Sequence, residues 1–306
     1  MRSDVIVENL DEIAKQNKIV VRDLMKVYQR GEKEVIALRG LDFEVGRGEF
    51  LSIIGPSGSG KSTLLKLLGA LDKPTAGSIL FDGHSVTILD DKRSMLYRRQ
   101  KVGFVWQTGN LVPGLTALKN VMLPMRLAGK KRGEADGRAR LLLSSLGLEA
   151  RMNHRPHQLS GGENQRVAIC VALANNPELL LADEITGELD TETTELVMQS
   201  LRRINQEFGT TVVNVTHNPR VAAHADRVLR IRDGLIEGQR HTLYGDITEV
   251  DAKGRMVLPE AVRKLANIGK RVVLKVTSEG LLVVPLDTSA GSEGRLTEEA
   301  EETGTQ

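Results

Sequence analysis

The chain has 306 residues, of which 40% are hydrophobic and 27% charged, and its formal net charge is +2. These values are ordinary for a globular protein with one large and one small domain, and the small net charge gives no argument for a polyanionic partner. No apolar run approaches the ~18 residues of a membrane span, and residues 1–16 carry acids where a targeting signal needs an apolar core. We therefore expect a cytoplasmic protein that does not span the membrane itself.

The amino-terminal part predicts an arm followed by a β-subdomain. Residues 1–17 have no clear period and are predicted to be the arm. Residues 18–24 and 36–45 alternate with period two, which is typical of antiparallel strands. Tyr28 falls in the predicted turn between these runs, and from position alone a stacking role and ordinary packing are equally open.

The run from Gly55 to Thr63 has the pattern of a phosphate-binding loop. It follows the apolar residues 50–54 and precedes Leu64 to Leu68, so strand, glycine loop and helix come in the required order. Backbone N–H groups of such a loop, and the start of the helix, hold anionic oxygens. The predicted triphosphate site contains Gly55, Pro56, Ser57, Gly58, Ser59, Gly60, Lys61, Ser62 and Thr63. Lys61 is expected to reach the β- and γ-phosphates, and the Ser62 hydroxyl to ligate magnesium.

The middle of the chain predicts strands alternating with helices. Strand candidates at residues 77–83 and 102–106 precede a helical subdomain at about residues 108–165. The basic run 129–133 inside it is expected to be a solvated loop, with contact to lipid or a partner as the alternative. A helix at 164–175, a strand at 179–184, a helix at 191–208 and a strand at 211–216 follow. This alternation predicts an α/β fold with a largely parallel sheet.

Four polar residues at the ends of predicted strands complete a phosphoryl-transfer site. Asp183 ends a buried strand and is a candidate magnesium ligand. Glu184 is the candidate base for the attacking water. Gln107 and His217 end two other strands, and both side chains can hydrogen-bond a phosphate, the metal or the water.

Residues 18–240 resemble the ATP-binding subunit of ABC transporters, a P-loop NTPase fold with a β-subdomain and a helical subdomain. Walker A is Gly55 to Thr63, the Q-loop is Gln107, the signature is Leu159 to Glu163, Walker B is Leu179 to Glu184, and the switch histidine is His217. The resemblance implies an ATPase using ATP and Mg²⁺, with Glu184, His217 and Gln107 as catalytic residues and Ser62, Gln107 and Asp183 at the metal.

The same resemblance implies a homodimer with two shared ATP molecules. Tyr28 would then stack on adenine, and the D-loop, residues 187–190, would bring Asp190 to the nucleotide. The signature residues Ser160, Gly161 and Gly162 would contact the ATP that is bound to the opposite subunit. A helix follows this triplet, and its amino end can face the γ-phosphate.

Residues 71–77, 110–117 and 158–163 resemble the lipoprotein-release and macrolide-export branch of this family. The implied partner is an integral membrane permease of the FtsX or MacB type, and the implied location is the inner face of the cell membrane. Several positions depart from the usual motifs, namely Ile185, Glu188 and Asn218, together with Asn164 and Val171 in the signature helix. An active ATPase is still expected, with a slow one as the alternative.

Residues 244–287 resemble the AbrB or MazE swapped-hairpin domain, a small mainly-β unit. The matching residues are Val250-Asp251, Lys253-Gly254-Arg255 and Leu258-Pro259. A dimerising or regulatory module is favoured over a DNA-binding one, because the basic and acidic residues nearly balance. The alternative function is a soluble ATP-responsive DNA-binding regulator. The polar, acidic residues 288–306 are expected to form a disordered tail.

Overall fold

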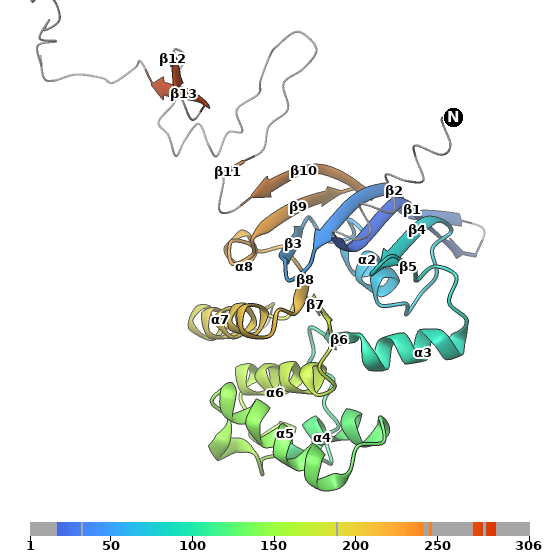
Figure 1. Ribbon diagram of the computed structural model, residues 1–306, viewed down its shortest axis with the longest axis vertical. Coiled ribbons are helices and arrows are strands. Elements are labelled where there is room, and N and C mark those ends of the chain that lie inside the picture. Colours follow the sequence, from blue (N-terminus) through green and yellow to red (C-terminus); the bar gives the residue numbers. More distant parts are fainter. Residues whose placement is uncertain are drawn as a thin grey trace, which may run out of the picture. The chain divides into compact units, whose positions relative to one another are not determined.

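The structure is a computed structural model that describes residues 17–31, 33–187, 189–241, 245–246, 272–277 and 280–285 (Figure 1). The chain separates into two compact units, divided between residues 247 and 248, and each is considered by itself. Residues 1–16, most of the predicted swapped-hairpin domain and the predicted acidic tail lie outside the described residues.

The first unit is built on a seven-stranded sheet with the order β11-β10-β9-β3-β8-β7-β6. Strands β9, β3, β8, β7 and β6 run parallel to one another, as the alternation of strands and helices predicts, whereas β10 is antiparallel to β9 and β11. The central strands β3, β7 and β8 are almost fully buried. The bounds are Phe50–Ile54 for β3, Val102–Val105 for β6, Leu179–Asp183 for β7, Thr211–Thr216 for β8, Arg227–Arg232 for β9, Leu235–His241 for β10 and Gly245–Asp246 for β11.

A second, antiparallel sheet has the order β2-β1-β4-β5 and is the expected β-subdomain. Its long hairpin joins β1 (Asn17–Arg30) to β2 (Lys33–Gly46), and β4 (Ala76–Phe81) and β5 (His84–Ser85) complete it. Tyr28 pairs with Val35 inside this hairpin. The prediction that Tyr28 lies in a turn is therefore wrong, because both strands extend well past the period-two runs.

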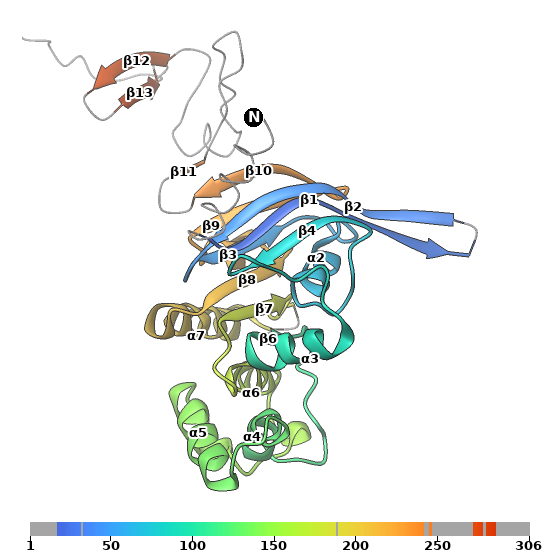
Figure 2. The same cartoon turned by 45° about the vertical axis from the view of Figure 1, so that its right-hand side comes forward.

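Helices cover both sides of the central sheet, and a helical subdomain gathers at one end. In Figures 1 and 2, α4, α5 and α6 lie together, whereas α2 lies on the other side of the sheet, next to the antiparallel sheet. The helices are α2 (Lys61–Leu68), α3 (Asp91–Gln100), α4 (Ala117–Leu127), α5 (Arg132–Ser145), α6 (Gly161–Leu173), α7 (Thr191–Phe208) and α8 (Pro219–Ala222), with 3₁₀ turns η1 (Glu149–Arg151) and η2 (Pro156–Gln158). Because α5 begins at Arg132, the basic run 129–133 is only partly a loop, which corrects the prediction.

Alternate residues of the central strands feed two cores. On β7, Leu180 and Ala182 join the core that contains α6, α7 and the helical subdomain. Leu179 and Leu181 join the core that contains α2 and the antiparallel sheet. Successive side chains of a strand point to opposite faces. The continuous apolar run of β7 is thus explained by burial on both sides, and its carboxyl end, Asp183, is the first polar position.

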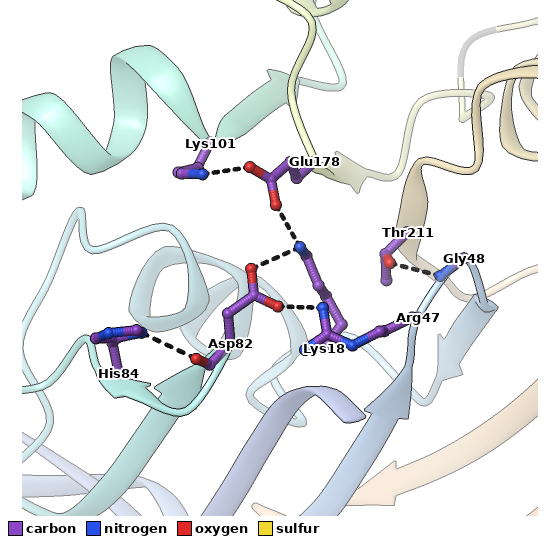
Figure 3. A network of polar contacts seen from close by, with 8 residues as sticks. All are labelled: Lys18, Arg47, Gly48, Asp82, His84, Lys101, Glu178 and Thr211. Carbon is purple, nitrogen blue, oxygen red and sulfur yellow. Dashed lines mark hydrogen bonds and ion pairs between the residues drawn. The ribbon is translucent and has the colours of Figure 1, made fainter. Parts of the chain in front are cut away.

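A polar network joins the two sheets at the amino ends of the parallel strands (Figure 3). Lys18, which is 7% exposed, donates to Asp82 at 2.7 Å and also to Glu178. Arg47 pairs with Asp82 at 2.5 Å, and Lys101 pairs with Glu178. Lys18 belongs to β1, whereas Glu178 immediately precedes β7, so the network links the antiparallel sheet to the central one.

The second unit contains a described antiparallel hairpin of β12 (Val272–Thr277) and β13 (Gly280–Pro285). Val272 pairs with Pro285 and Thr277 with Gly280. The two-strand hairpin predicted in this region is therefore present. The swapped-hairpin domain as a whole stays a prediction.

Candidate active site

The phosphate loop joins β3 to α2 and leaves room for an anion. Gly60 caps α2 with φ of 101°, and a Cβ there would lie 2.5 Å from the Ala37 carbonyl oxygen, so only glycine fits. Gly58 has φ of 81°, and no atom lies within 4 Å of the position that its Cβ would take. Pro56, Ser57 and Gly58 are exposed. The loop thus offers an open face to a ligand.

Two polar side chains of the loop lack the partners that a phosphate provides. The Ser59 hydroxyl is buried and has no hydrogen-bond partner within the described ranges. Lys61 is 4% exposed and donates from Nζ to the carbonyl oxygens of Gly55 at 2.8 Å and Pro56 at 3.0 Å. A buried ammonium whose hydrogen bonds go to carbonyl oxygens, with the Glu184 carboxylate 3.7 Å away, and a buried hydroxyl without a partner both fit an anionic ligand.

Ser62 and Asp183 form the expected pair for a cation. The Ser62 hydroxyl donates to Asp183 Oδ1 at 3.0 Å. Burial raises the pKa of Asp183; the Ser62 hydrogen bond opposes this effect and the neighbouring Glu184 charge adds to it. A carboxylate that is costly to ionise, next to a hydroxyl, suits a hard cation such as Mg²⁺. Within the described residues, no group of three His, Cys, Asp or Glu side chains forms a further metal site.

Glu184 and His217 meet at the carboxyl ends of β7 and β8. His217 Nδ1 lies 3.1 Å from Glu184 Oε2, and Lys61 Nζ lies 3.7 Å from the other oxygen of the same carboxylate. Glu184 has a positive φ of 46°, which is unusual for a residue with a side chain. Such strain persists where the surrounding structure holds it, and it is common at active sites. The backbone thus holds this carboxylate between the phosphate-loop lysine and the histidine.

Gln107 follows β6 and lies near the start of the D-loop. A Cβ on Gly187 would lie 3.4 Å from Gln107 Nε2. The preceding Trp106 stacks on Phe104, with ring centroids 4.4 Å apart and planes 14° apart. The structure therefore places the Gln107 amide beside the chain that follows Glu184.

Tyr28 lines an open pocket of 730 Å³ together with Thr63, Lys66, Asp72 and Trp106. Its hydroxyl donates to Asp72 Oδ2 at 2.8 Å, and Lys26 Nζ lies 4.7 Å from the ring centroid. Burial, followed by the Asp72 hydrogen bond, raises the pKa of Tyr28. Asp72 also accepts from Lys26 at 2.7 Å. The ring is therefore fixed at its edge and covered on one face by a cation.

The signature residues Ser160, Gly161 and Gly162 start α6, which packs in the helical subdomain rather than against α2 (Figures 1 and 2). Ser160 and Glu163 form a capping box: Ser160 N donates to Glu163 Oε2 at 2.8 Å, and Glu163 N donates to Ser160 Oγ at 3.2 Å. Gly161 is exposed. A Cβ on Gly162 would overlap the Thr193 methyl group of α7.

Asp190 has a structural contact within its own chain. It caps α7, accepting from Thr193 N and Thr193 Oγ1, each at 2.8 Å. Sequence reasoning assigned Asp190 to the nucleotide and did not find this cap, although an aspartate before a helical run signals one. Glu188 lies outside the described residues.

Two other departures from the family motifs have clear structural places. Ile185 is 2% exposed in the core. Asn218 caps α8 by accepting from Arg220 N at 3.0 Å, a role that aspartate and asparagine fill equally well. Sequence reasoning also missed Lys26 and Asp72 as supports of Tyr28, because nothing in their spacing places them beside it.

The fold and the site define a P-loop nucleotide-binding domain with a helical subdomain. The family model described as ABC transporter matches residues 38–187. The lipoprotein-releasing system ATP-binding protein LolD of Geobacter metallireducens is 47% identical, over 71% of this chain and 96% of its own length. The macrolide export ATP-binding/permease protein MacB of Syntrophobacter fumaroxidans is 46% identical over 76% of this chain, and the match spans 33% of MacB.

A solved structure of a dimeric ATP-binding cassette in a post-hydrolysis state, bound to ADP and Pi, matches with a TM-score of 0.69 and 44% identity. The match covers 73% of this chain and 98% of that one. The chain belongs to the ABC transporter family, as its ATP-binding subunit, and it is an ATPase. The DNA-binding alternative has no support in these comparisons. No helix in the described ranges is long and apolar enough to cross a bilayer.

Proposed function

We propose that Glu184 is the general base of ATP hydrolysis and that His217 orients it. The attacking water transfers a proton to the Glu184 carboxylate and bonds to the γ-phosphorus, and the bond to the β–γ bridging oxygen breaks, leaving ADP. The contact of 3.1 Å between His217 Nδ1 and Glu184 Oε2 is the observation that carries this proposal. Lys61, 3.7 Å from the same carboxylate, exchanges its carbonyl acceptors for phosphate oxygens when ATP binds.

Ser62, Asp183 and Gln107 are the proposed magnesium residues. The hydrogen bond between Ser62 and Asp183 and the burial of Asp183 support this assignment. A bound magnesium ion supplies positive charge that neutralises phosphate oxygens. The Gln107 side-chain amide, at the start of the helical subdomain, lies beside Gly187. In this position it can contact the bound nucleotide and couple its presence to the helical subdomain.

The dimeric unit is proposed to contain two composite sites. Ser160 and Gly161 are exposed and Gly162 is buried at the amino end of α6, which lies in the helical subdomain, whereas the phosphate loop of the same chain leads into α2. Amino ends of helices bind anions. We therefore assign them to the ATP on the partner subunit, while Tyr28 and the phosphate loop hold the ATP of their own chain. The solved relative with ADP and Pi is also dimeric.

The membrane partner is proposed to be a separate permease of the FtsX or MacB type, with this subunit docked on the inner face of the membrane. The MacB relative carries ATP-binding and permease parts in one chain, and this chain matches a third of it. The carboxyl-terminal AbrB-like domain is proposed to support dimerisation. The hairpin of β12 and β13 and the short strand β11 are the described parts of that region.

The ATPase rate of the Glu184→Gln variant tests whether Glu184 is the general base. The amide cannot accept the proton, so the steady-state ATPase rate is expected to fall by about 10² to 10⁴. ATP affinity should stay within about twofold. Fluorescence of Trp106, the one tryptophan of the sequence and a wall of the Tyr28 pocket, reports binding. Glu207→Gln, on the exposed side of α7, is the control. Unchanged turnover would remove Glu184 as the base.

Co-purification tests the membrane partner. The Glu184→Gln chain is held closed with ATP in solubilised cells, and the proteins that accompany it are identified. We expect one FtsX-like or MacB-like permease in fixed proportion. Recovery of DNA without any membrane protein would contradict the proposal.

A further inference from the structure

A second pocket lies at the opposite ends of the parallel strands from the phosphate loop. It has a volume of 540 Å³ and is bounded by α5 and α6 of the helical subdomain and by the loops that precede β3, β7 and β8. This volume is within the usual range for small-molecule sites. None of the residues assigned to ATP lines it.

The pocket carries an excess of positive charge. Lys18, Arg47 and Arg138 line it, against the single carboxylate of Glu178. Lys18 and Lys101 neutralise Glu178, as Figure 3 shows. Arg47 pairs with Asp82 through Nη1 and is about half exposed, so its other guanidinium N–H groups, together with Arg138, can face an anion.

Arg138 is the main cationic group of this wall, because its half-buried guanidinium is held by backbone carbonyl oxygens rather than by a carboxylate. Its Nε and Nη2 donate to the carbonyl oxygens of Ala174 at 2.9 Å and Leu173 at 3.0 Å. No carboxylate in the described part of the chain pairs with it. Partial burial lowers the pKa of Arg138, because desolvation disfavours its charged form. Among the described residues, none accepts a hydrogen bond from Arg138 Nη1, so this group can donate to a ligand.

The other wall of the pocket is apolar, and hydrogen bonds hold the loops at its rim in place. Leu142 and Leu173 line it, and Phe208, which is 62% exposed, stands at its edge. Gly48 N donates to Thr211 Oγ1 at 2.9 Å. Asn205 Nδ2 donates to Gly48 O at 2.7 Å and Thr210 O at 2.9 Å. These bonds fix the loops, so the pocket exists without its ligand.

We propose that this pocket binds a small amphipathic carboxylate, with its anionic group between Arg138 and Arg47 and its apolar part against Leu142, Leu173 and Phe208. Guanidinium groups bind carboxylates with charge-assisted hydrogen bonds. Because α5 and the core loops form opposite walls, the bound molecule joins the helical subdomain to the catalytic core. This pocket is separate from the proposed ATP site. A negative result for carboxylate binding would therefore leave the proposed ATP-site roles untouched, and the reverse also holds.

Calorimetric titration of the full chain with sodium decanoate, below its micelle concentration, tests the proposal. We expect saturable binding at one site, with affinity reduced at least about tenfold in Arg138→Gln and in Arg47→Gln. Phe208→Ser should weaken binding by about fivefold. Decanol, which has the same chain without the charge, should bind more weakly than decanoate.

Arg140→Gln is the matched control, because Arg140 lies on α5, is exposed and pairs with Asp136 outside the pocket. Its affinity for decanoate should equal that of the unchanged protein. If Arg138→Gln does not fold, Arg47→Gln decides, since the Arg47 side chain is about half exposed. The absence of saturable binding, equal affinity in the Arg47 variant, or equal binding of decanol and decanoate would each overturn the proposal.

Discussion

Tyr28 illustrates how the contacts of a single side chain suit the stacking role proposed for it. Lys26 covers one ring face and Asp72 holds the hydroxyl, which leaves the other face for a base. Stacking of a base on an aromatic ring contributes about 1 to 3 kcal/mol. We expect Tyr28→Ala to weaken ATP binding by about tenfold and Tyr28→Phe to weaken it by less than threefold, measured by Trp106 fluorescence. Equal losses in both variants would show that the hydroxyl, rather than the ring, matters.

We expect Asn218 to act as a positioning residue for the neighbouring His217. Its side chain caps α8, and its backbone N–H donates to Thr216 Oγ1 at 3.1 Å. Loss of a cap costs about 1 kcal/mol. We expect Asn218→Ala to reduce the ATPase rate by a few fold with little change in KM, and Asn218→Asp to retain the rate. A full rate in the alanine variant would show that the cap does not position His217.

At the residue scale, the sequence could predict the motif residues but not their neighbours. The spacing of Gly55 to Thr63 and the strand ends at Asp183 and His217 are local patterns. The contact of Asp72 with Tyr28 joins residues 44 apart in the chain and has no such pattern. The hydrogen bond from Lys61 Nζ to the Gly55 carbonyl oxygen is likewise set by the folded loop and cannot be read from the motif.

At the element scale, α6 and α7 are fitted together through Gly162. Its missing side chain makes room for the Thr193 methyl group. We expect Gly162→Ala to lower the melting temperature, as overpacking costs about 1 to 3 kcal/mol. Thr193→Ser removes that methyl group and keeps the hydroxyl that bonds to Asp190. The double variant should recover most of the lost stability. If the Gly162→Ala variant and the double variant with Thr193→Ser have the same melting temperature, the steric explanation is wrong.

The elements with strong periodicity were predictable, and the others were not. The helix at residues 191–208 and the strand at 211–216 agree with α7 and β8. No prediction was made for α3, whose residues are mostly charged, or for β9, in which arginines interrupt the apolar pattern. The long hairpin of β1 and β2 was underestimated because its tip is exposed on both faces.

At the scale of the whole molecule, the polar network of Lys18, Arg47, Asp82, Lys101 and Glu178 links the two sheets. Its contribution to the stability of the fold depends on pH. Burial would raise the pKa of Asp82, but hydrogen bonds and charge from Lys18 and Arg47 outweigh it and lower the pKa. A lowered folded-state pKa contributes stability above the unfolded value of about 4, and this contribution is lost as the pH falls through the folded value.

We therefore expect Asp82→Asn to reduce the free energy of unfolding by about 1 kcal/mol at pH 7, since the carboxylate is partly exposed. The difference between the two proteins should shrink as the pH is lowered below about 4. Denaturant unfolding at a series of pH values measures it, and a constant difference across the series would contradict the role of the ionised carboxylate.

The central claim is that one ATP site uses residues of two chains. Lys61→Ala removes the phosphate contact, and Ser160→Asp keeps the helix cap while adding a negative charge toward the γ-phosphate. Each variant alone should be inactive. Heterodimers of the two, isolated through different tags, contain one intact composite site, so we predict that they regain a clear fraction of wild-type ATP turnover. Turnover no higher than that of the parent variants would contradict the two-chain site.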